Sequence, residues 1–428
     1  MSLMRRFTQA VGLRIVVMAT GMGISVVLAR ALGAETLGHY VFALSVVTIA
    51  AVPVQAGLPM LLTKSLPKYQ VAEEPARIRG LLVFALVFVL AFAGLALAIY
   101  WAADTWLTRQ FGPYAGRPVM HLAILLLPFI ALSTVFGAAI RSLGRLLVGQ
   151  VIETALRQGV LLGLLCAVAL GAVGAQLSAE LAMRLHIAAA LFTTAVGAAI
   201  LMLGCGVTGW RDGRAMDWRV WTTTLLPLSM IAGLQVILGK SDVIMLRGLA
   251  GAEAVALYFI ANQLGNLVFL ANQAVQMVNG PMLARSVQQA DLAAVQHVYA
   301  RGALFVFLCA LPLAAMLLIF GRPIINLIFG PDFHAAYPVV VVFAIGYVCQ
   351  AFLGNTDMLL KVTDNEWVVL RAIALGIAAN LALNALLIPW LGTVGAALAS
   401  VAVTLGVKLY LLREIKTRLG ITPLATFR

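Results

Sequence analysis

Four amide side chains, Asn262, Asn266, Gln273 and Gln276, lie inside an otherwise apolar stretch in the second half of the chain. Their spacing of i, i+4, i+11 and i+14 places them on one face of a helix, and Phe269 occupies the i+7 position on the same face. Amides both donate and accept hydrogen bonds, which suits sugar hydroxyls. The pattern predicts a polar stripe lining a pathway for a saccharide. The alternative is that the amides hydrogen-bond to neighbouring membrane helices.

Three basic side chains within or beside apolar stretches, Arg14, Lys240 and Lys361, are candidates for binding phosphate. A charge at bilayer depth costs about 2.5–3.5 kcal/mol, so such residues usually face a lumen or a partner. A guanidinium group binds phosphate bidentately, and we expect Arg14 to contact a diphosphate. The alternative for Arg14 and Lys361 is that the long side chain extends to the membrane surface.

A second polar stripe consists of Gln350, Gly354, Asp357 and Lys361, at i, i+4, i+7 and i+11. Gln350 would join the amides that line the pathway. Asp357 is either a site for a coupling ion or the i, i+4 partner of Lys361.

Two further carboxylates, Asp242 and Glu153, are candidates for ion coupling. Each also has a structural alternative. Asp242 would pair with Lys240 or Arg247, and Glu153 would pair with Arg157 one helical turn away. Coupling would draw on a proton or Na⁺ gradient, or on the membrane potential alone.

The elements that hold these residues are membrane-spanning helices. Hydrophobic residues make up 63% of the 428 residues and charged residues 11%, with mean hydropathy +1.02. A soluble domain of this size requires far more polar surface. About 20 apolar residues span a bilayer, and we predict about twelve spans in an all-α integral membrane protein. They are 10–32, 37–62, 80–103, 119–140, 146–170, 181–207, 221–246, 255–283, 302–320, 339–360, 367–389 and 394–412.

The basic residues are distributed unevenly across the predicted connections. With a cytoplasmic N-terminus, 18 lie in inner connections and tails and 6 in outer ones. This positive-inside bias predicts cytoplasmic termini, so the net charge of +13 does not indicate nucleic-acid binding. The four cysteines and five histidines are scattered, which predicts no disulfide framework, metal site or resident cofactor.

The sequence contains a weak internal repeat. Residues 28–40, containing Gly33-Ala34-Glu35 and Tyr40, recur as 246–258 with Gly251-Ala252-Glu253 and Tyr258. The same shift pairs Gln55 with Gln273, which adds Gln55 to the predicted pathway. We therefore predict two pseudo-symmetric six-helix lobes, 1–208 and 221–428, joined by a cytoplasmic linker at 209–220. An amphipathic interfacial helix is expected near 284–300.

Four segments, 28–40, 241–258, 321–336 and 380–397, together resemble the polysaccharide transporter family. They include Ser241-Asp242-Val243, Gly321-Arg322-Pro323 and Asn380-Leu381-Ala382-Leu383-Asn384. These transporters are the Wzx-type flippases of the MOP (multidrug/oligosaccharidyl-lipid/polysaccharide) superfamily.

The resemblance implies two lobes in a V and alternating access. It also implies that undecaprenyl-diphosphate-linked oligosaccharide moves from the cytoplasmic to the outer leaflet of a bacterial inner membrane. The product would serve O-antigen or exopolysaccharide synthesis, with a polymerase and a chain-length regulator as partners besides the membrane lipid.

Three alternatives remain open at this point. A cation-coupled drug exporter of the MATE type would favour acidic residues in its lumen, yet the first span carries Arg14 and no acid. A lipid II flippase is expected to have two more helices. A membrane polysaccharide polymerase would require a large outer loop or paired carboxylates, which the sequence lacks, so we expect a transporter and not an enzyme.

Overall fold

The computed structural model describes residues 3–111, 116–171, 176–204, 215–289, 291–363 and 365–420. These ranges form helices joined by short turns, with no strand among them, which confirms the predicted all-α class. The predicted linker at 209–220 lies partly outside the described residues. Contacts group the chain into two compact units, Met1–Val236 and Ile237–Arg428. The lobes 1–208 and 221–428 remain predictions, because compactness alone does not define a symmetry repeat.

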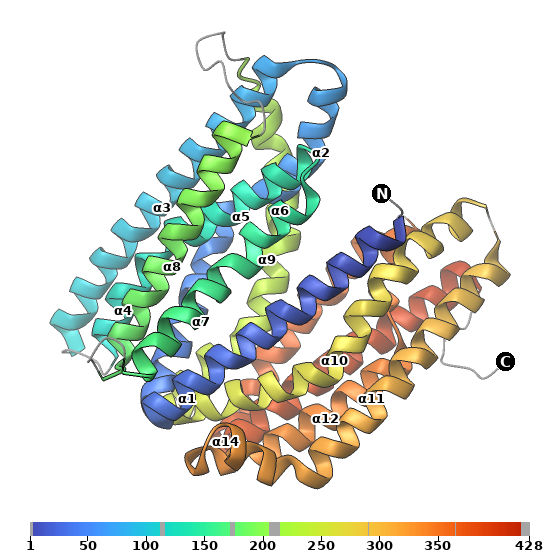
Figure 1. The fold of residues 1–428 in the computed structure, drawn as a ribbon. Coiled ribbons are helices and arrows are strands. Elements are labelled where there is room, and N and C mark those ends of the chain that lie inside the picture. The colour runs from blue at the N-terminus through green and yellow to red at the C-terminus, as the bar shows by residue number, and fades with distance from the viewer. Residues whose placement is uncertain are drawn as a thin grey trace. The chain divides into compact units, whose positions relative to one another are not determined.

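The first unit is built around α5, which is enclosed by α1, α2, α3 and α8 (Figure 1). Its elements are α1 (Leu3–Gln55), α2 (Leu58–Val71), α3 (Pro75–Phe111), α4 (Arg117–Ile124), α5 (Leu126–Ser142), α6 (Leu146–Gln150), the π-helical turn η1 (Val151–Ala155), α7 (Leu156–Ala169), α8 (Ala179–Ala199) and the π-helical turn η2 (Ile200–Gly204). The first part of α9 (Trp218–Leu249) also belongs to this unit.

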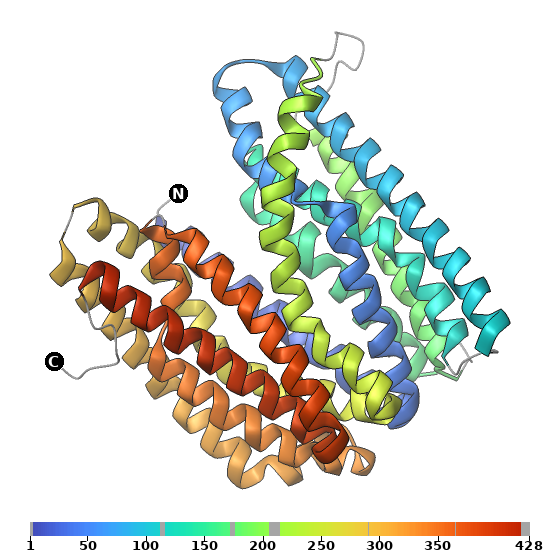
Figure 2. The same cartoon turned by 180° about the vertical axis from the view of Figure 1, so that it is seen from behind.

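In the second unit α10, α11 and α12 run side by side (Figure 1). Its elements are the remainder of α9, α10 (Gly251–Gln288), α11 (Leu292–Ile328), the 3₁₀ turn η3 (Pro331–Ala336), α12 (Tyr337–Leu353), α13 (Thr356–Val362) and α14 (Glu366–Leu419). The view from behind shows the two arms of α14, in orange-red and red (Figure 2).

Nine helical stretches of the described chain are long and apolar enough to cross a membrane. Two of them, Gly12–Val71 with 60 residues and Glu366–Arg418 with 53, are each long enough for two crossings. Each contains a glycine with a non-helical backbone, Gly33 (φ 72°) or Gly392 (φ 56°), where the helix turns. With these two counted as pairs, the stretches provide eleven of the predicted crossings. The twelfth, 255–283, lies in α10, which is not among the nine stretches.

Glycine explains the turn in each copy of the internal repeat. Gly33 has φ 72° and its counterpart Gly251 has φ 91°, a backbone region that residues with a Cβ rarely adopt. Seven residues further on, Tyr40 and Tyr258 are both buried, with 2% and 3% of their surface exposed. The repeated sequence therefore encodes the same local structure twice: a tight turn between two spans, then a buried phenol.

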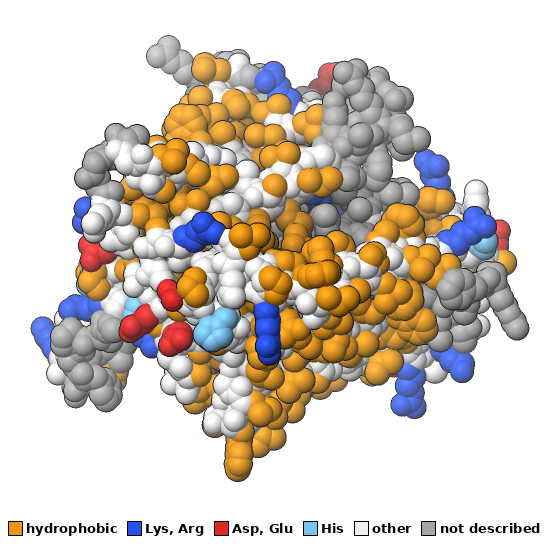
Figure 3. All heavy atoms as spheres, turned by 60° about the horizontal axis from the view of Figure 1, so that its bottom comes forward, with side chains coloured by type: hydrophobic (Ala, Val, Ile, Leu, Met, Phe, Trp, Pro, Cys, Tyr) orange, Lys and Arg blue, Asp and Glu red, His pale blue; other side chains and the backbone are white. Residues whose placement is uncertain are grey.

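The helices α3 and α11 present large apolar side chains on the outside of their units. Their exposed members include Val87, Leu90, Leu95, Ile99, Phe305, Ile319 and Phe320. Figure 3 shows a broad field of hydrophobic side chains on one face of the molecule, with most charged side chains at its margins. In water this surface would be unfavourable, whereas hydrocarbon tails cover it without cost.

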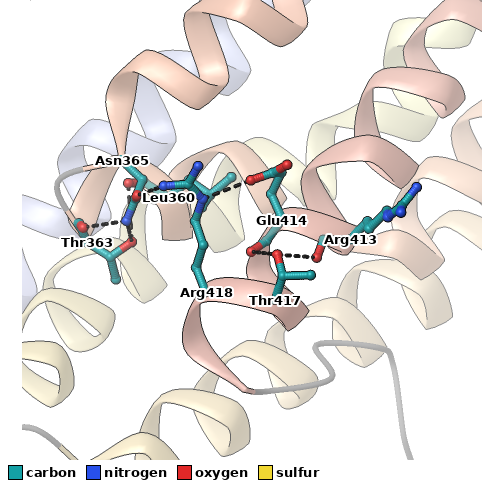
Figure 4. A network of polar contacts seen from close by, with 7 residues as sticks. All are labelled: Leu360, Thr363, Asn365, Arg413, Glu414, Thr417 and Arg418. Carbon is teal, nitrogen blue, oxygen red and sulfur yellow. Dashed lines mark hydrogen bonds and ion pairs between the residues drawn. The ribbon is translucent and has the colours of Figure 1, made fainter.

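The end of α14 is tied to the turn before its own beginning (Figure 4). Arg418 Nη1 donates to Asn365 Oδ1 at 3.1 Å, and Arg418 Nε lies 2.8 Å from Glu414 Oε2. Asn365 Nδ2 in turn donates to the Thr363 carbonyl at 2.7 Å. These contacts hold together the ends of the two arms of α14.

Two predicted elements are different in the structure. No separate interfacial helix occupies 284–300, because α10 continues to Gln288 and α11 begins at Leu292. The predicted span 339–360 is also not one continuous helix. It divides into α12 and α13 at Gly354, whose φ of 70° and ψ of −161° are not helical.

Candidate functional site: a buried carboxylate, a broken helix and an amide face

Asp242 in α9 is a buried carboxylate surrounded by neutral hydrogen-bond donors. Its Oδ1 accepts from Asn380 Nδ2 at 3.0 Å and from Asn384 Nδ2 at 2.6 Å. Its Oδ2 accepts from the Tyr258 hydroxyl at 2.6 Å and from the Ser400 hydroxyl. Only 4% of Asp242 is exposed, and both asparagines are fully buried. Three helices, α9, α10 and α14, therefore converge on one carboxylate.

The four hydrogen bonds described for Asp242 all come from neutral groups, and Lys240 forms no ion pair with it. The alternative pairing with Arg247 stays a prediction. The negative charge is held by amide and hydroxyl dipoles. Asn384 Oδ1 is buried and has no hydrogen-bond partner, although a buried polar atom normally has one. Carboxylate, amide and hydroxyl oxygens thus meet at a place that suits a proton or a hard cation.

The amide stripe of α10 lies on the half-exposed face of that helix. The opposite face, with Ile260, Leu264 and Val268, is buried in the second unit. The half-exposed face carries Asn262, Asn266, Phe269, Gln273 and Gln276. The predicted spacing therefore yields a polar face that is only partly buried in its own unit.

Some members of this α10 face also contact neighbours. Asn266 Nδ2 donates to Asn262 Oδ1 at 3.1 Å. Gln276 Nε2 donates to Asn355 Oδ1 at 3.0 Å. The Phe269 ring lies 5.6 Å from the ring of Tyr347. The structural alternative, hydrogen bonding between helices, thus holds for Gln276.

The break at Gly354 is stabilised by side chains from two other helices. The Tyr299 hydroxyl of α11 donates to the Leu353 carbonyl at 2.7 Å. The Lys408 ammonium of α14 donates to the Gly354 carbonyl. Broken helices inside a membrane require such replacement donors and acceptors. The break separates Gln350, which is buried in α12, from Asp357 and Lys361 in α13, so the predicted continuous stripe is wrong.

Asp357 and Lys361 form an ion pair, with 3.0 Å between Oδ2 and Nζ. Both side chains are about 40% exposed, 42% for Asp357 and 39% for Lys361. The pairing alternative is therefore what the structure shows. An exposed pair contributes little to stability, and Lys361 keeps donors available on its exposed side.

Glu153 pairs with Arg141 of α5 and not with Arg157, so the expected i, i+4 pair is wrong. Close packing makes the contact between α5 and η1 possible. A Cβ on Gly137 would lie 2.8 Å from Glu153 Cβ, and a Cβ on Gly149 would lie 2.4 Å from the Gly137 carbonyl oxygen. Small residues thus let the two helices approach each other, which brings the guanidinium to the carboxylate.

Replacing Arg141 with glutamine is expected to destabilise the protein by about 1–3 kcal/mol, because a partly buried carboxylate loses its partner. The melting temperature of the full-length protein in detergent measures the effect. The double change Arg141→Gln with Glu153→Gln should recover most of the loss. The exposed Arg145→Gln is the control and should not change the melting temperature. Equal melting temperatures for Arg141→Gln and the control would contradict a structural pair.

The other predicted residues are distributed over both units. Arg14 is exposed on α1, and Gln55 is half-buried as the last residue of the same helix. Lys240 is half-buried in α9 and makes no ion pair with a described residue. Arg14, Gln55 and Glu153 belong to the first unit, whereas the remaining predicted residues belong to the second.

Sequence reasoning missed the partners of Asp242 and the role of Lys408. Asn380 and Asn384 are spaced i, i+4 within an apolar span, and this amide pair is the same signal that identified the stripe in α10. Tyr258 could have been found through the repeat, since Tyr40 is its counterpart. Nothing in the local sequence of Lys408 indicates that its ammonium group donates a hydrogen bond to the Gly354 carbonyl.

Buried polar groups within long apolar helices and helices broken inside a span are typical of membrane transporters. The family model "Polysaccharide biosynthesis protein" matches residues 27–338. The chain therefore belongs to the polysaccharide biosynthesis protein family. The match supports the prediction of a multi-pass transporter and not an enzyme.

Solved structures share this fold at low sequence identity. An inward-facing multidrug resistance MATE family transporter of the MOP superfamily aligns with TM-score 0.79 and 13% identity, covering 94% of each chain. The lipid II flippase MurJ aligns with TM-score 0.70 and 12% identity over 94% of this chain and 86% of its own. A MOP superfamily transporter from Pyrococcus furiosus, described as having a binding pocket of reversed polarity, aligns with TM-score 0.65, 12% identity and coverage of 97% and 95%. These likenesses establish the MOP transporter fold.

Among curated proteins, an uncharacterized membrane protein of Methanocaldococcus jannaschii is 28% identical over 167 residues. The aligned region covers 39% of this chain and 33% of that protein. This alignment carries no assignment of substrate.

Proposed function

We propose that the protein is a flippase. It moves undecaprenyl-diphosphate-linked oligosaccharide from the cytoplasmic to the outer leaflet of the bacterial inner membrane by alternating access. The oligosaccharide then enters O-antigen or exopolysaccharide synthesis, where a polymerase and a chain-length regulator act on it. Both termini are cytoplasmic in this proposal, as the distribution of basic residues indicates. Family membership supports the proposal at the level of polysaccharide biosynthesis.

The observation that carries the proposal is the half-exposed amide face of α10. Amides exposed to hydrocarbon would be unfavourable, so this face is best explained by a hydrated pathway. Asn262, Asn266 and Gln273 offer both donors and acceptors to sugar hydroxyls. Phe269 adds an aromatic surface beside them. Gln55 and Gln350 remain part of the proposed pathway, and Gln276 reaches it only if it leaves Asn355.

The charges favour an anionic substrate over a cationic drug. The three candidate acids for coupling all have partners. Glu153 forms an ion pair with Arg141 and Asp357 forms one with Lys361. Asp242 accepts hydrogen bonds from neutral donors. Lys240 has no acidic partner among the described residues. We assign Arg14, Lys240 and Lys361 to the diphosphate. Outward movement of two negative charges gains about 4–5 kcal/mol per 100 mV of inside-negative potential.

Among the three acids, Asp242 fits ion coupling best. Glu153 and Asp357 already have cationic partners, which neutralise them. Asp242 has only neutral donors around it, and Asn384 Oδ1 beside it lacks a partner. A proton or Na⁺ at this carboxylate would satisfy that oxygen or displace a donor. Binding would therefore alter the contacts that hold α9, α10 and α14 together.

Replacing Asn266 with alanine is expected to slow head-group translocation about tenfold, because one sugar contact of about 1–1.5 kcal/mol is lost. The assay uses full-length protein in liposomes that contain the lipid-linked oligosaccharide. Newly exposed sugar is detected with an external lectin. Arg14→Ala should slow the same step through its phosphate contact. Asn326→Ala, an exposed amide at the end of α11, is the matched control. Normal rates for both Asn266→Ala and Arg14→Ala, each stably inserted, would remove the basis for the proposed pathway.

A further inference from the structure

Arg157, a cationic side chain near the centre of a span, forms no ion pair with an acid of the described residues. It lies in α7, close to the midpoint of the membrane-spanning stretch Leu146–Ala169. Glu153, one turn earlier, is occupied by Arg141. A charge at this depth costs about 2.5–3.5 kcal/mol, and no described residue offsets it by a hydrogen bond or an ion pair. An unpaired guanidinium in this position requires an explanation.

Only part of the Arg157 side chain is shut off from solvent. Its Nε is buried and has no hydrogen-bond partner. The terminal nitrogens form no hydrogen bond with a described residue. The side chain as a whole is half-buried. Among the described residues, no group accepts a hydrogen bond from the Arg157 guanidinium.

Two polar groups lie on the helices that pack against α7. The Tyr40 hydroxyl and His186 Nδ1 are 2.9 Å apart and buried, and the helices that carry them, α1 and α8, both contact α7. Three helices therefore meet here. If the phenol donates to Nδ1, the ring proton lies on Nε2 and becomes a further donor. The neighbourhood thus contains donors and a positive charge, and no acid of the described chain pairs with it.

We propose that Arg157 is an anion-binding residue of the first unit and contacts a phosphate of the prenyl diphosphate group, with His186 and Tyr40 positioning it. Guanidinium binds phosphate bidentately, and a bound phosphate would also offset the cost of the buried charge. The inference rests on the proposed function for its ligand. It does not depend on the assignment of Arg14, Lys240 and Lys361 to the diphosphate.

Binding of farnesyl diphosphate to the purified full-length protein in detergent tests this inference, with farnesol as the uncharged probe. We expect Arg157→Gln to weaken diphosphate binding about tenfold or more and Arg157→Lys to weaken it about threefold, since lysine lacks the planar fork. Farnesol binding should not change. The control is Arg184→Gln on α8, whose side chain is 66% exposed, and it should bind farnesyl diphosphate within about twofold of the wild type.

Unchanged diphosphate affinity in Arg157→Gln would overturn the inference, as would absence of binding to the wild type. If the glutamine variant does not fold, unchanged affinity in Arg157→Lys overturns it equally. The proposed function fails separately. Arg157-dependent binding by a protein that translocates no lipid-linked oligosaccharide would refute the flippase and leave the anion site in place.

Discussion

Asp242→Asn is expected to abolish acceleration of head-group translocation by an imposed ion gradient, and to lower the residual rate about tenfold or more. In the native protein, two amide groups donate to Oδ1 and two hydroxyl groups donate to Oδ2. An asparagine replaces one acceptor oxygen with a donor, so two of these four groups lose their acceptor. Each unsatisfied buried group costs about 1–3 kcal/mol, and the variant can no longer bind a proton or a cation through a carboxylate.

The experiment imposes a proton gradient and a Na⁺ gradient in turn on liposomes that contain the wild type or the variant. The wild type should respond to one of them and Asp242→Asn to neither. Asp332→Asn, an exposed acid in η3, is the matched control and should respond as the wild type does. A variant still driven by the same gradient would show that coupling lies elsewhere or that the potential alone suffices. A melting-temperature increase with Na⁺ in the wild type alone would independently identify the cation.

Gly354→Ala should be among the most destabilising single changes in the second unit. The backbone at Gly354, with φ 70° and ψ −161°, lies in a region nearly restricted to glycine, and occupying it with another residue costs about 1–3 kcal/mol. An added Cβ would also lie 2.8 Å from the Tyr299 hydroxyl oxygen. The hydroxyl would have to move from the Leu353 carbonyl, which would leave that carbonyl unsatisfied inside the membrane.

We expect the melting temperature of Gly354→Ala to fall by about 5 °C or more. Gly406→Ala in α14 is the control, because nothing lies within 4 Å of its added Cβ, and alanine favours a helix. Lys408→Met, which removes the donor to the Gly354 carbonyl, should destabilise in the same direction. Equal stability of Gly354→Ala and Gly406→Ala would mean that the chain tolerates a continuous helix here.

The class of the fold could be predicted from the sequence because membrane spans are strong local signals. About 20 apolar residues are enough to identify each one, and the repeat identified Gly33 and Gly251 as matching turns. The amide face of α10 could also be predicted from the sequence, because helical periodicity alone places Asn262, Asn266 and Gln273 on one side of the helix.

Partners across helices could not be predicted in the same way. Asp242 obtains its donors from Asn380 and Ser400, well over a hundred residues away, and no local pattern indicates which helices meet. The expected pairs within a helix were wrong for Glu153 because packing at Gly137 brought Arg141 closer. The break at Gly354 could not be predicted for the same reason. The stretch around it is apolar, and the side chains that donate to its carbonyls, Tyr299 and Lys408, come from other helices.

Head-group translocation in proteoliposomes tests the central claim most directly. Liposomes with the full-length protein carry undecaprenyl-diphosphate-linked oligosaccharide, lipid II or the cationic dye ethidium in separate preparations. The account predicts that external lectin gains access to inner-leaflet oligosaccharide well above protein-free liposomes, while ethidium is not transported and lipid II moves slowly if at all. Gradient-driven ethidium transport without movement of oligosaccharide would contradict it and make the protein a drug exporter. Preferential movement of lipid II would retain a flippase but reject the proposed substrate.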